Sequence, residues 1–199
     1  MYEDLTRERE MLTRIAKKLS SRNMQTGNGG NISLRLTDHA FLVKATDTSF
    51  DRANPSDFVV CDMEGNLLEG EKRASKESGL HGALYKKYTA CQAIVHCHSP
   101  WATGWASTLK PLPTATYHSV LKLGGNIPCI DTNSYAVPRE YYEQIFDLLD
   151  KTEGGKGFLL KGHGQVAFGK SLYEALDLAE LIEETAHIAV IEQLLKGNY

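Results

Sequence analysis

The chain has 199 residues, of which 42% are hydrophobic and 24% charged, and its 22 basic and 25 acidic side chains give a formal net charge of −3. This length favours a single domain over residues 1–199, and the composition is that of a folded globular protein rather than a disordered chain. The basic residues are dispersed, which argues against nucleic acid as a partner. No apolar run approaches the roughly 18 residues that would cross a membrane, so a membrane partner is not expected either.

The N-terminal residues 1–9 are too charged for a signal peptide. The four cysteines lack CxxC spacing and are typical of reduced thiols, so we expect a cytoplasmic protein.

Helical and extended patterns alternate along the chain. In chain order they predict a helix over 5–21, a glycine-rich loop over 25–31, strands over 32–36, 40–44 and 58–62, a helix over 76–88, a strand over 92–98, a short helix over 101–107, extended segments over 114–120 and 127–130, a helix over 138–149, strands over 158–161 and 165–168, and a helix from 171 to about 195. Ser171 and Glu174 have capping-box spacing at the start of the last helix. Interleaved strands and helices predict an α/β fold in which helices cover one sheet, with the first three strands arranged as a meander.

Three of the seven histidines are placed to chelate one metal ion. Residues two apart on a strand point to the same face, about 6.6 Å apart, so His96 and His98 can aim at one point. His163, between two glycines after another predicted strand, is the best candidate for a third ligand. Three histidines with an open fourth position are typical of catalytic zinc sites. His-x-His also occurs by chance and single buried histidines are usually core residues, so spacing alone leaves both interpretations open.

Glu77 lies at the start of the helix that leads into the His-x-His strand. A carboxylate near a metal-bound substrate can act as a general base, but an acid at a helix N-terminus more often interacts with the helix dipole. The 29–31 loop, Thr46 and Ser75 offer donors for an anion, although each alone is a common turn or cap residue. His81, one helical turn after Glu77, either forms a hydrogen bond near the site or only packs.

Motifs spread over most of the chain resemble those of the class II aldolase/adducin family. They run in the family's order, at similar spacing, from Leu12 to about Leu195. The motifs are Gly29-Gly30-Asn31-Ile32-Ser33, Ser75-Lys76-Glu77 with Leu80-His81, Ala93-Ile94-Val95-His96-Cys97-His98, Gly162-His163-Gly164, and Gly169-Lys170-Ser171-Leu172 with Glu174-Ala175. The resemblance implies a single α/β domain with a central, mostly antiparallel sheet flanked by helices in three layers. It also implies a homotetramer with active sites between subunits.

The resemblance further implies roles for individual residues. His96, His98 and His163 match the family's zinc ligands. Glu77 matches the acid that moves a proton and that can approach the metal when no substrate is bound. The positions that match the family's phosphate pocket are Gly30, Asn31, Thr46, Ser75 and Lys76.

Three positions depart from the family's pattern. The catalytic tyrosine that a neighbouring subunit contributes aligns with His118, next to Tyr117, so the proton donor is left open between these two residues. Asp47 stands where the family's aldolases have a glycine, and Lys76 where they have a second serine. A carboxylate beside a phosphate is repulsive unless Lys76 or a turn of the chain offsets it, so a phosphorylated substrate is expected but not secured.

The activity that the resemblance implies is that of a zinc-dependent aldolase. Zinc, or another divalent metal, would act as a Lewis acid on a small, phosphorylated, ketose-like sugar and stabilise the enediolate left by carbon–carbon cleavage, while Glu77 moves the proton. The Ser-Lys-Glu motif also resembles decarboxylases of 3-oxo-tetronate 4-phosphate, in which Lys76 would meet the acid group of the substrate. A third alternative is a non-catalytic, adducin-like binding module, against which the intact histidines and Glu77 argue.

Overall fold

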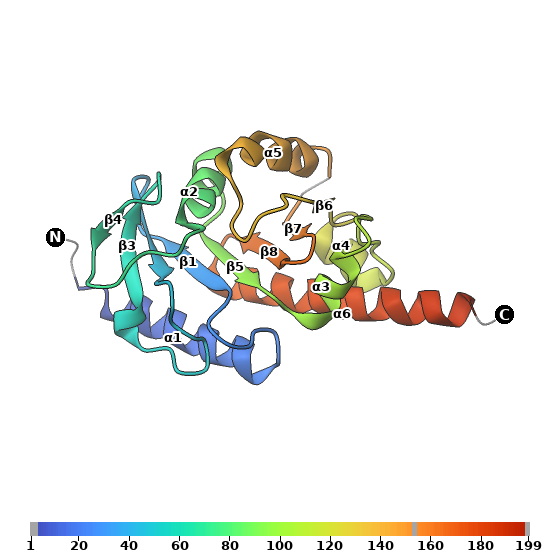
Figure 1. The fold of residues 1–199 in the computed structure, drawn as a ribbon, viewed down its shortest axis with the longest axis horizontal. Helices are drawn as coiled ribbons and strands as arrows, with labels where there is room; N and C mark the ends of the chain where they lie inside the picture. The colour runs from blue at the N-terminus through green and yellow to red at the C-terminus, as the bar shows by residue number, and fades with distance from the viewer. Residues whose placement is uncertain (1–3, 153–154, 198–199) are drawn as a thin grey trace.

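An eight-stranded sheet runs through the protein in the strand order β4-β3-β2-β1-β5-β8-β7-β6 (Figure 1). The computed structural model describes residues 4–152 and 155–197. The strands are β1 (Asn31–Arg35), β2 (Ala40–Lys44), β3 (Phe58–Asp62), β4 (Leu67–Glu69), β5 (Ala93–Cys97), β6 (Cys129–Ile130), β7 (Gly157–Leu160) and β8 (Gly164–Gly169). The helices are α1 (Thr6–Ser21), α2 (Ser78–Lys87), α3 (Pro100–Ala106), α4 (Tyr117–Leu123), α5 (Tyr142–Asp150) and α6 (Leu172–Lys196), with short 3-10 helices η1 (Pro55–Asp57) and η2 (Arg139–Tyr141).

Helices cover both faces of the sheet and make three layers (Figure 1). On one face α1, α3 and α6 bury side chains such as Leu12 and Ile182, and on the other face α2 and α5 bury side chains such as Leu84. Alternate residues of a strand point to opposite faces, so Val95 of β5 joins the first cluster and Ile94 the second. This arrangement confirms the expected α/β fold with a sheet flanked by helices.

The central strand β5 determines where the site is built. Strands β1 to β3 form the predicted meander, which β4 extends, and β5 pairs with β1 on one side and with β8 on the other. Within the described residues, β6 and β7 pair in parallel and the other neighbouring strands pair antiparallel. His96 of β5 lies opposite Asn31 in one pair and opposite Val166 in the other.

The prediction of an extended segment over 114–120 is wrong, because α4 begins at Tyr117. Thr116 and Ser119 cap this helix reciprocally: Thr116 Oγ1 accepts a hydrogen bond from Ser119 N at 3.0 Å, and Ser119 Oγ accepts one from Thr116 N at 3.0 Å. A serine in place of the usual Glu or Gln completes the box. The capping signal for this helix was therefore not recognised among residues that favour strands.

Two further differences from the sequence-based expectation are a later helix start and an additional strand. Pro138 precedes the 3-10 helix η2, and α5 begins only at Tyr142. Strand β4 was not predicted, because Leu67 and Leu68 are adjacent and both exposed, which breaks the alternation typical of a half-buried strand.

The predicted start of α6 is confirmed, with one change in its capping. Ser171 Oγ accepts a hydrogen bond from Glu174 N at 3.1 Å, whereas Glu174 Oε2 accepts from Lys170 N, one residue before the position that a capping box would use.

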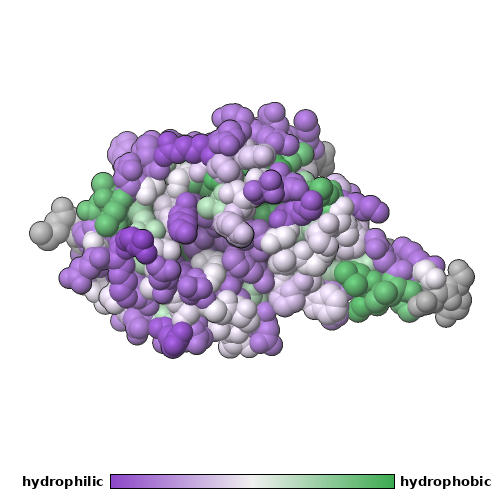
Figure 2. Space-filling view, in the orientation of Figure 1, coloured by the Kyte–Doolittle hydropathy of each residue, from purple (hydrophilic) through white to green (hydrophobic). Residues whose placement is uncertain are grey.

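The surface is largely polar, with apolar patches over β4 and near the end of α6 (Figure 2). The exposed apolar side chains there include Leu67, Leu68, Leu194 and Leu195. No helix of the described chain is long and apolar enough to cross a membrane. Cys61, Cys91, Cys97 and Cys129 are free.

Candidate metal centre and active site

Three histidines converge at one end of the central strands. His96 is on β5, His98 follows the end of that strand, and His163 lies in the turn between β7 and β8. Antiparallel pairing of β5 with β8 brings this turn beside the end of β5. The Nε2 atom of His96 is 3.1 Å from His98 Nε2 and 3.3 Å from His163 Nε2.

These separations fit a shared metal ion. Ligands that bind zinc at 2.0–2.1 Å with tetrahedral geometry are roughly 3.3–3.4 Å apart. His96 Nδ1 is 2.8 Å from Gln165 O, and a carbonyl can only accept a hydrogen bond, so Nδ1 carries the proton and Nε2 presents its lone pair. A cation bound among the three Nε2 atoms would take a lone pair from each ring. The donor set thus fits a divalent metal held by His96, His98 and His163.

Burial keeps these imidazoles neutral. Removal from water lowers the pKa of His96 to about 4, of His98 to about 3 and of His163 to about 4. A neutral imidazole is the form that binds a metal. The cluster is therefore in its ligating protonation state at neutral pH.

The glycine-rich loop packs directly against His96 and His98. His98 N donates a hydrogen bond to Gln25 Oε1 at 2.8 Å, and Gln25 is buried. A Cβ atom on Gly29 would lie 2.7 Å from His98 Nδ1, and one on Gly30, where φ is 62°, would lie 2.8 Å from His96 O. The two glycines are therefore required by the close approach of the loop to β5. Sequence reasoning missed Gln25, although its position at the start of this loop was a usable signal.

Glu77 directs its carboxylate at the histidine cluster. It is the N-cap residue of α2, but its side chain makes no capping hydrogen bond. Glu77 Oε2 accepts a hydrogen bond from Asn31 Nδ2 at 2.9 Å and lies 3.2 Å from His96 Nε2. The other oxygen, Oε1, is buried and has no hydrogen-bond partner among the described residues. This geometry favours a chemical role for Glu77 over an interaction with its own helix.

The segments matched to a phosphate pocket meet beside this carboxylate. Asn31 contacts Glu77 directly, and Ser75 Oγ accepts a hydrogen bond from Glu77 N at 3.3 Å. Thr46 N donates to Arg73 O at 3.0 Å, which places the residues that follow β2 next to the segment that leads into α2. The segments that carry Asn31, Thr46 and Ser75, far apart in sequence, are thus neighbours.

Asp47 does not carry an unopposed charge at this pocket. Its φ of 60° is the left-handed conformation that glycine adopts readily, which accounts physically for the glycine in the family's pattern. Arg73 Nη2 donates to Asp47 Oδ2 at 2.8 Å. The expected offset therefore comes from Arg73, while the Lys76 side chain is exposed.

Lys44 is a buried cation that sequence reasoning missed. It is only 2% exposed, and its Nζ donates to Thr48 O at 2.6 Å, Ala45 O at 3.3 Å and Asn28 O at 3.5 Å. Burial lowers its pKa to about 8, against the opposing effects of Asp57 and Asp47. The sequence signal for this residue was a lysine at the last position of an otherwise apolar strand. Lys44 ties the glycine-rich loop to the end of β2 and adds a positive charge there.

His118 is not brought to the histidine cluster within its own chain. It lies on α4 and, with Lys122 and α6 residues such as Asp177, lines a separate cavity of about 350 Å³, to which no described metal-ligand candidate contributes. Tyr117 is 96% exposed. Neither candidate proton donor therefore contacts Glu77 in a single chain.

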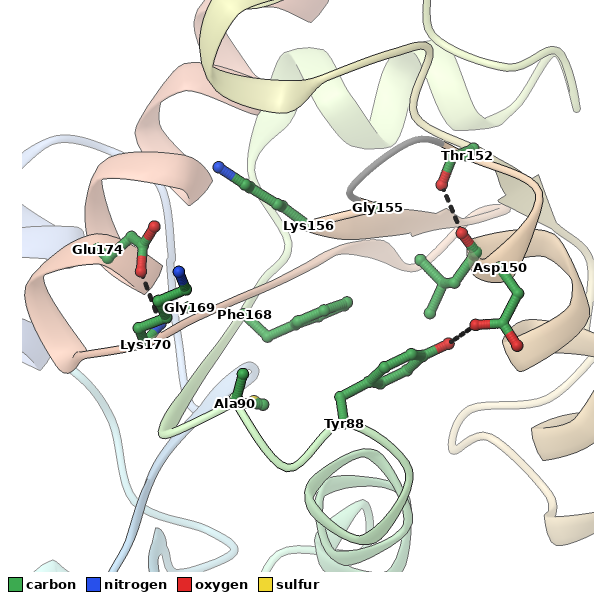
Figure 3. A pocket seen from close by; sticks show the side chains of 12 residues that line it. Tyr88, Ala90, Asp150, Thr152, Gly155, Lys156, Phe168, Gly169, Lys170 and Glu174 are labelled. Atoms are coloured by element: carbon green, nitrogen blue, oxygen red, sulfur yellow. Dashed lines mark hydrogen bonds between the residues drawn. The ribbon is translucent and has the colours of Figure 1, made fainter.

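A larger cavity, of about 510 Å³, lies between the ends of α2 and α5 and the end of β8 (Figure 3). The rings of Tyr88 and Phe168 stack there with centroids 5.7 Å apart, and Tyr88 OH donates to Asp150 at 2.9 Å. Lys156 and Lys170 are also part of its lining. None of the candidate site residues lines this cavity, so its size does not identify the active site.

Comparison with known proteins places this geometry in a family. Residues 10–190 match the family described as Class II Aldolase and Adducin N-terminal domain. The chain therefore belongs to the class II aldolase/adducin family, as its motifs indicated.

The similar proteins include a decarboxylase and aldolases. The chain is 36% identical to 3-oxo-tetronate 4-phosphate decarboxylase of Haemophilus influenzae, over 96% of this chain and 91% of the relative. It is 29% identical to 5-deoxy-D-ribulose 1-phosphate aldolase of Bacillus thuringiensis, over 92% and 84%. Among solved structures, L-fuculose-1-phosphate aldolase from Thermus thermophilus matches with a TM-score of 0.82 and 25% identity, covering 94% of this chain and 95% of the other.

Proposed function

We propose that the protein is a metal-dependent decarboxylase of a small 3-oxo sugar acid phosphate, with 3-oxo-tetronate 4-phosphate as the first candidate substrate. The observation that carries the proposal is the convergence of the Glu77 carboxylate on three imidazole nitrogens beside a group of anion donors. The choice of decarboxylation over aldol cleavage is supported by the higher identity to the decarboxylase, 36% against 29% for the aldolase.

The proposed reaction needs a stabilised negative charge and one proton. In a 3-oxo acid the carboxylate is β to a ketone, so loss of CO2 breaks the C1–C2 bond and leaves its electron pair as an enediolate. C2 then takes a proton, and the products are CO2 and dihydroxyacetone phosphate. A divalent metal bound by His96, His98 and His163 would supply Lewis-acid stabilisation of the ketone oxygen, and zinc suits three neutral imidazoles.

Glu77 is the residue proposed to move the proton. Asn31 holds Oε2 by a hydrogen bond, and the unpartnered Oε1 is the atom left to carry a proton to or from the substrate carbon. Its buried setting keeps bulk water away from the transfer. The same group would remove a proton in the aldol direction, so its position supports either reaction.

The substrate's anionic groups are proposed to bind where the three loop segments meet. Gly30, Asn31, Thr46 and Ser75 would offer donors to the phosphate, with Lys44 as the positive charge behind them. Lys76, exposed beside Glu77, would meet the carboxylate that is lost.

The second proton-transfer group is proposed to come from another subunit of a homotetramer. His118, or its neighbour Tyr117, would reach the histidine cluster of an adjoining chain. Helix α4 supports this assembly because it exposes apolar side chains: Tyr117 is 96% exposed, Val120 51% and Leu121 76%. The reduced state expected for the four free cysteines fits a cytoplasmic location.

Product analysis tests the proposal. Zinc-loaded protein is incubated separately with 3-oxo-tetronate 4-phosphate and with 5-deoxy-D-ribulose 1-phosphate, and CO2 and aldehyde release are measured against a metal-free control. Metal-dependent release of CO2 together with dihydroxyacetone phosphate supports the decarboxylase. Aldehyde release from the second substrate alone would favour the aldolase, which the Bacillus thuringiensis relative makes the second candidate. A protein that binds zinc and catalyses neither reaction would contradict both.

A further inference from the structure

A chain of buried hydrogen bonds lies behind Glu77 and is not used by the proposed reaction. Ser33 of β1 contacts two residues of α2: its Oγ is 2.7 Å from Tyr85 OH and 2.7 Å from His81 Nδ1. All three side chains are 0% exposed. Polar groups buried this deeply are costly unless each has a partner, so this cluster needs a functional or structural reason.

The spacing of the cluster aligns α2 with β1. Glu77, the N-cap of α2, and His81 and Tyr85 within that helix are spaced four residues apart, so they share a face at about 6 Å intervals. Alternate residues of β1 share a face at about 6.6 Å intervals. The two spacings nearly match, and contacts join them in order: Asn31 Nδ2 with Glu77 Oε2, Ser33 Oγ with His81 Nδ1, and Arg35 Nη1 with Tyr85 O.

The directions of the shared protons follow from counting partners. If Tyr85 donates to Ser33 and Ser33 donates to His81 Nδ1, only the Nε2–H of His81 lacks a partner. In the opposite direction His81 Nδ1 donates to Ser33 and Ser33 to Tyr85. That direction leaves two groups without a hydrogen-bond partner, the phenol proton of Tyr85 and the Nε2 lone pair of His81, because the described residues provide no other contact for either atom. The first direction is favoured because it leaves one fewer buried polar atom without a hydrogen bond.

This direction sets which tautomer His81 adopts. Burial lowers the pKa of His81 to about 3, so the ring is neutral, and an acceptor role for Nδ1 puts the proton on Nε2.

We propose that His81 is a positioning residue: the hydrogen-bonded chain Tyr85→Ser33→His81 fixes its Nε2–H tautomer and holds α2 on β1 in the register that presents Glu77 to His96. This inference rests on the proposed function for its catalytic consequence, but the tautomer itself does not depend on any substrate.

Nitrogen NMR of the full-length, zinc-loaded protein tests the tautomer directly. With histidine labelled by 15N in the ring, multiple-bond proton–nitrogen correlation distinguishes protonated from unprotonated ring nitrogens. His81→Gln identifies the His81 signals by their loss. We expect Nε2 protonated and Nδ1 unprotonated at neutral pH. A proton on Nδ1, or an averaged mixture of tautomers, would overturn the proposal whether or not the enzyme turns over the proposed substrate.

Tyr85→Phe separates positioning from simple packing, because it removes one hydroxyl and keeps the ring. We expect the His81 tautomer preference to weaken, kcat to fall by about tenfold and KM and zinc content to stay unchanged, a loss the size of one buried hydrogen bond. Tyr88→Phe is the matched control, since Tyr88 OH contacts only Asp150 among the described residues, away from the histidines. A Tyr85→Phe protein with the native His81 spectrum and native kcat would refute the role. If no turnover is found for the unmodified protein, the proposed function fails and the spectra alone decide the present inference.

Discussion

Asn31 of β1 lies directly opposite His96 of β5, and both side chains meet the same oxygen of Glu77. Asn31 Nδ2 donates to Glu77 Oε2 at 2.9 Å, and His96 Nε2 is 3.2 Å from that oxygen. A cross-strand pair therefore fixes the distance between a candidate metal ligand and the acid proposed to move the proton. The Asn31 side chain thus links the sheet to the position of the Glu77 carboxylate.

Replacing Asn31 by alanine should damage catalysis more than metal binding. Hydrogen bonds to charged groups contribute about 1.5–3 kcal/mol, so we expect kcat/KM to fall by about 10–100-fold while the zinc content stays at the native level. Steady-state kinetics and metal analysis measure the two effects. Asn66→Ala, in the turn after β3, is the control because it removes a hydrogen bond to Asp62 only. Loss of zinc from Asn31→Ala would show that the asparagine supports the metal centre instead.

Glu77→Gln should abolish proton transfer and preserve the fold. General acid–base catalysis contributes about 10²- to 10⁴-fold, and we expect kcat to fall within that range. The amide is similar in size and shape to the carboxylate and can still accept from Asn31. Circular dichroism and metal analysis verify fold and zinc content. A variant that keeps more than a tenth of the native kcat would rule out Glu77 as the proton-transfer group.

Gly29→Ala should weaken zinc binding although it replaces none of the candidate ligands. The added Cβ would lie 2.7 Å from His98 Nδ1, so the imidazole must shift. Changes around metal ligands cost about 10–100-fold in affinity, and competition with a chromophoric chelator measures this loss. Gly125→Ala is the matched control, since its Cβ would have no described neighbour within 4 Å. Equal zinc affinity in the two variants would mean that the loop yields and that His98 does not depend on it.

The metal-free protein should lose stability in mild acid. His81 and His96 titrate near pH 6.5 when unfolded, but burial lowers their pKa values to about 3 and about 4 in the native state. Between these values the unfolded chain binds more protons, so the free energy of unfolding falls as the pH drops from about 6.5 to about 4. Urea unfolding in the presence of a chelator measures the slope. His81→Gln should reduce it, and a flat profile over this range would contradict the burial of these rings.

The ion pair between Arg73 and Asp47 should act on substrate affinity. Arg73→Ala leaves the Asp47 carboxylate unopposed beside the proposed phosphate site, and we expect KM for a phosphorylated substrate to rise by up to about fivefold, since exposed pairs contribute at most about 1 kcal/mol. Adding Asp47→Asn should restore KM, because asparagine tolerates the left-handed backbone of that position. A double variant as impaired as Arg73→Ala would instead indicate that Arg73 binds the substrate.

Much of the sheet could be predicted because its strands carry local signals. The segments 40–44 and 58–62 coincide with β2 and β3, and the two-residue spacing of His96 and His98 already implied a common direction. Segment 114–120 could not be identified correctly, because its capping pair uses Ser119 where a longer acid or amide is usual.

The parts of the site that were missed depend on contacts between distant residues. Gln25 meets His98 across 73 positions of sequence, and Ser33 meets Tyr85 across 52. The burial of Lys44 likewise depends on how its strand end packs. Local pattern marks the positions of Gln25 and Lys44 at most, because the partners of each side chain are set by the packing of the sheet against the loop and α2.

The central position of β5 bears on the order of events in folding. This strand joins the N-terminal meander to the C-terminal strands, and His96 and His163, 67 positions apart in sequence, come together only when that junction has closed. Contacts between residues distant in sequence are slow to form. Uptake of zinc during refolding should accordingly be a late event. Its rate would report the pairing of β5 with β8 rather than the earlier collapse of the N-terminal meander or of the C-terminal strands.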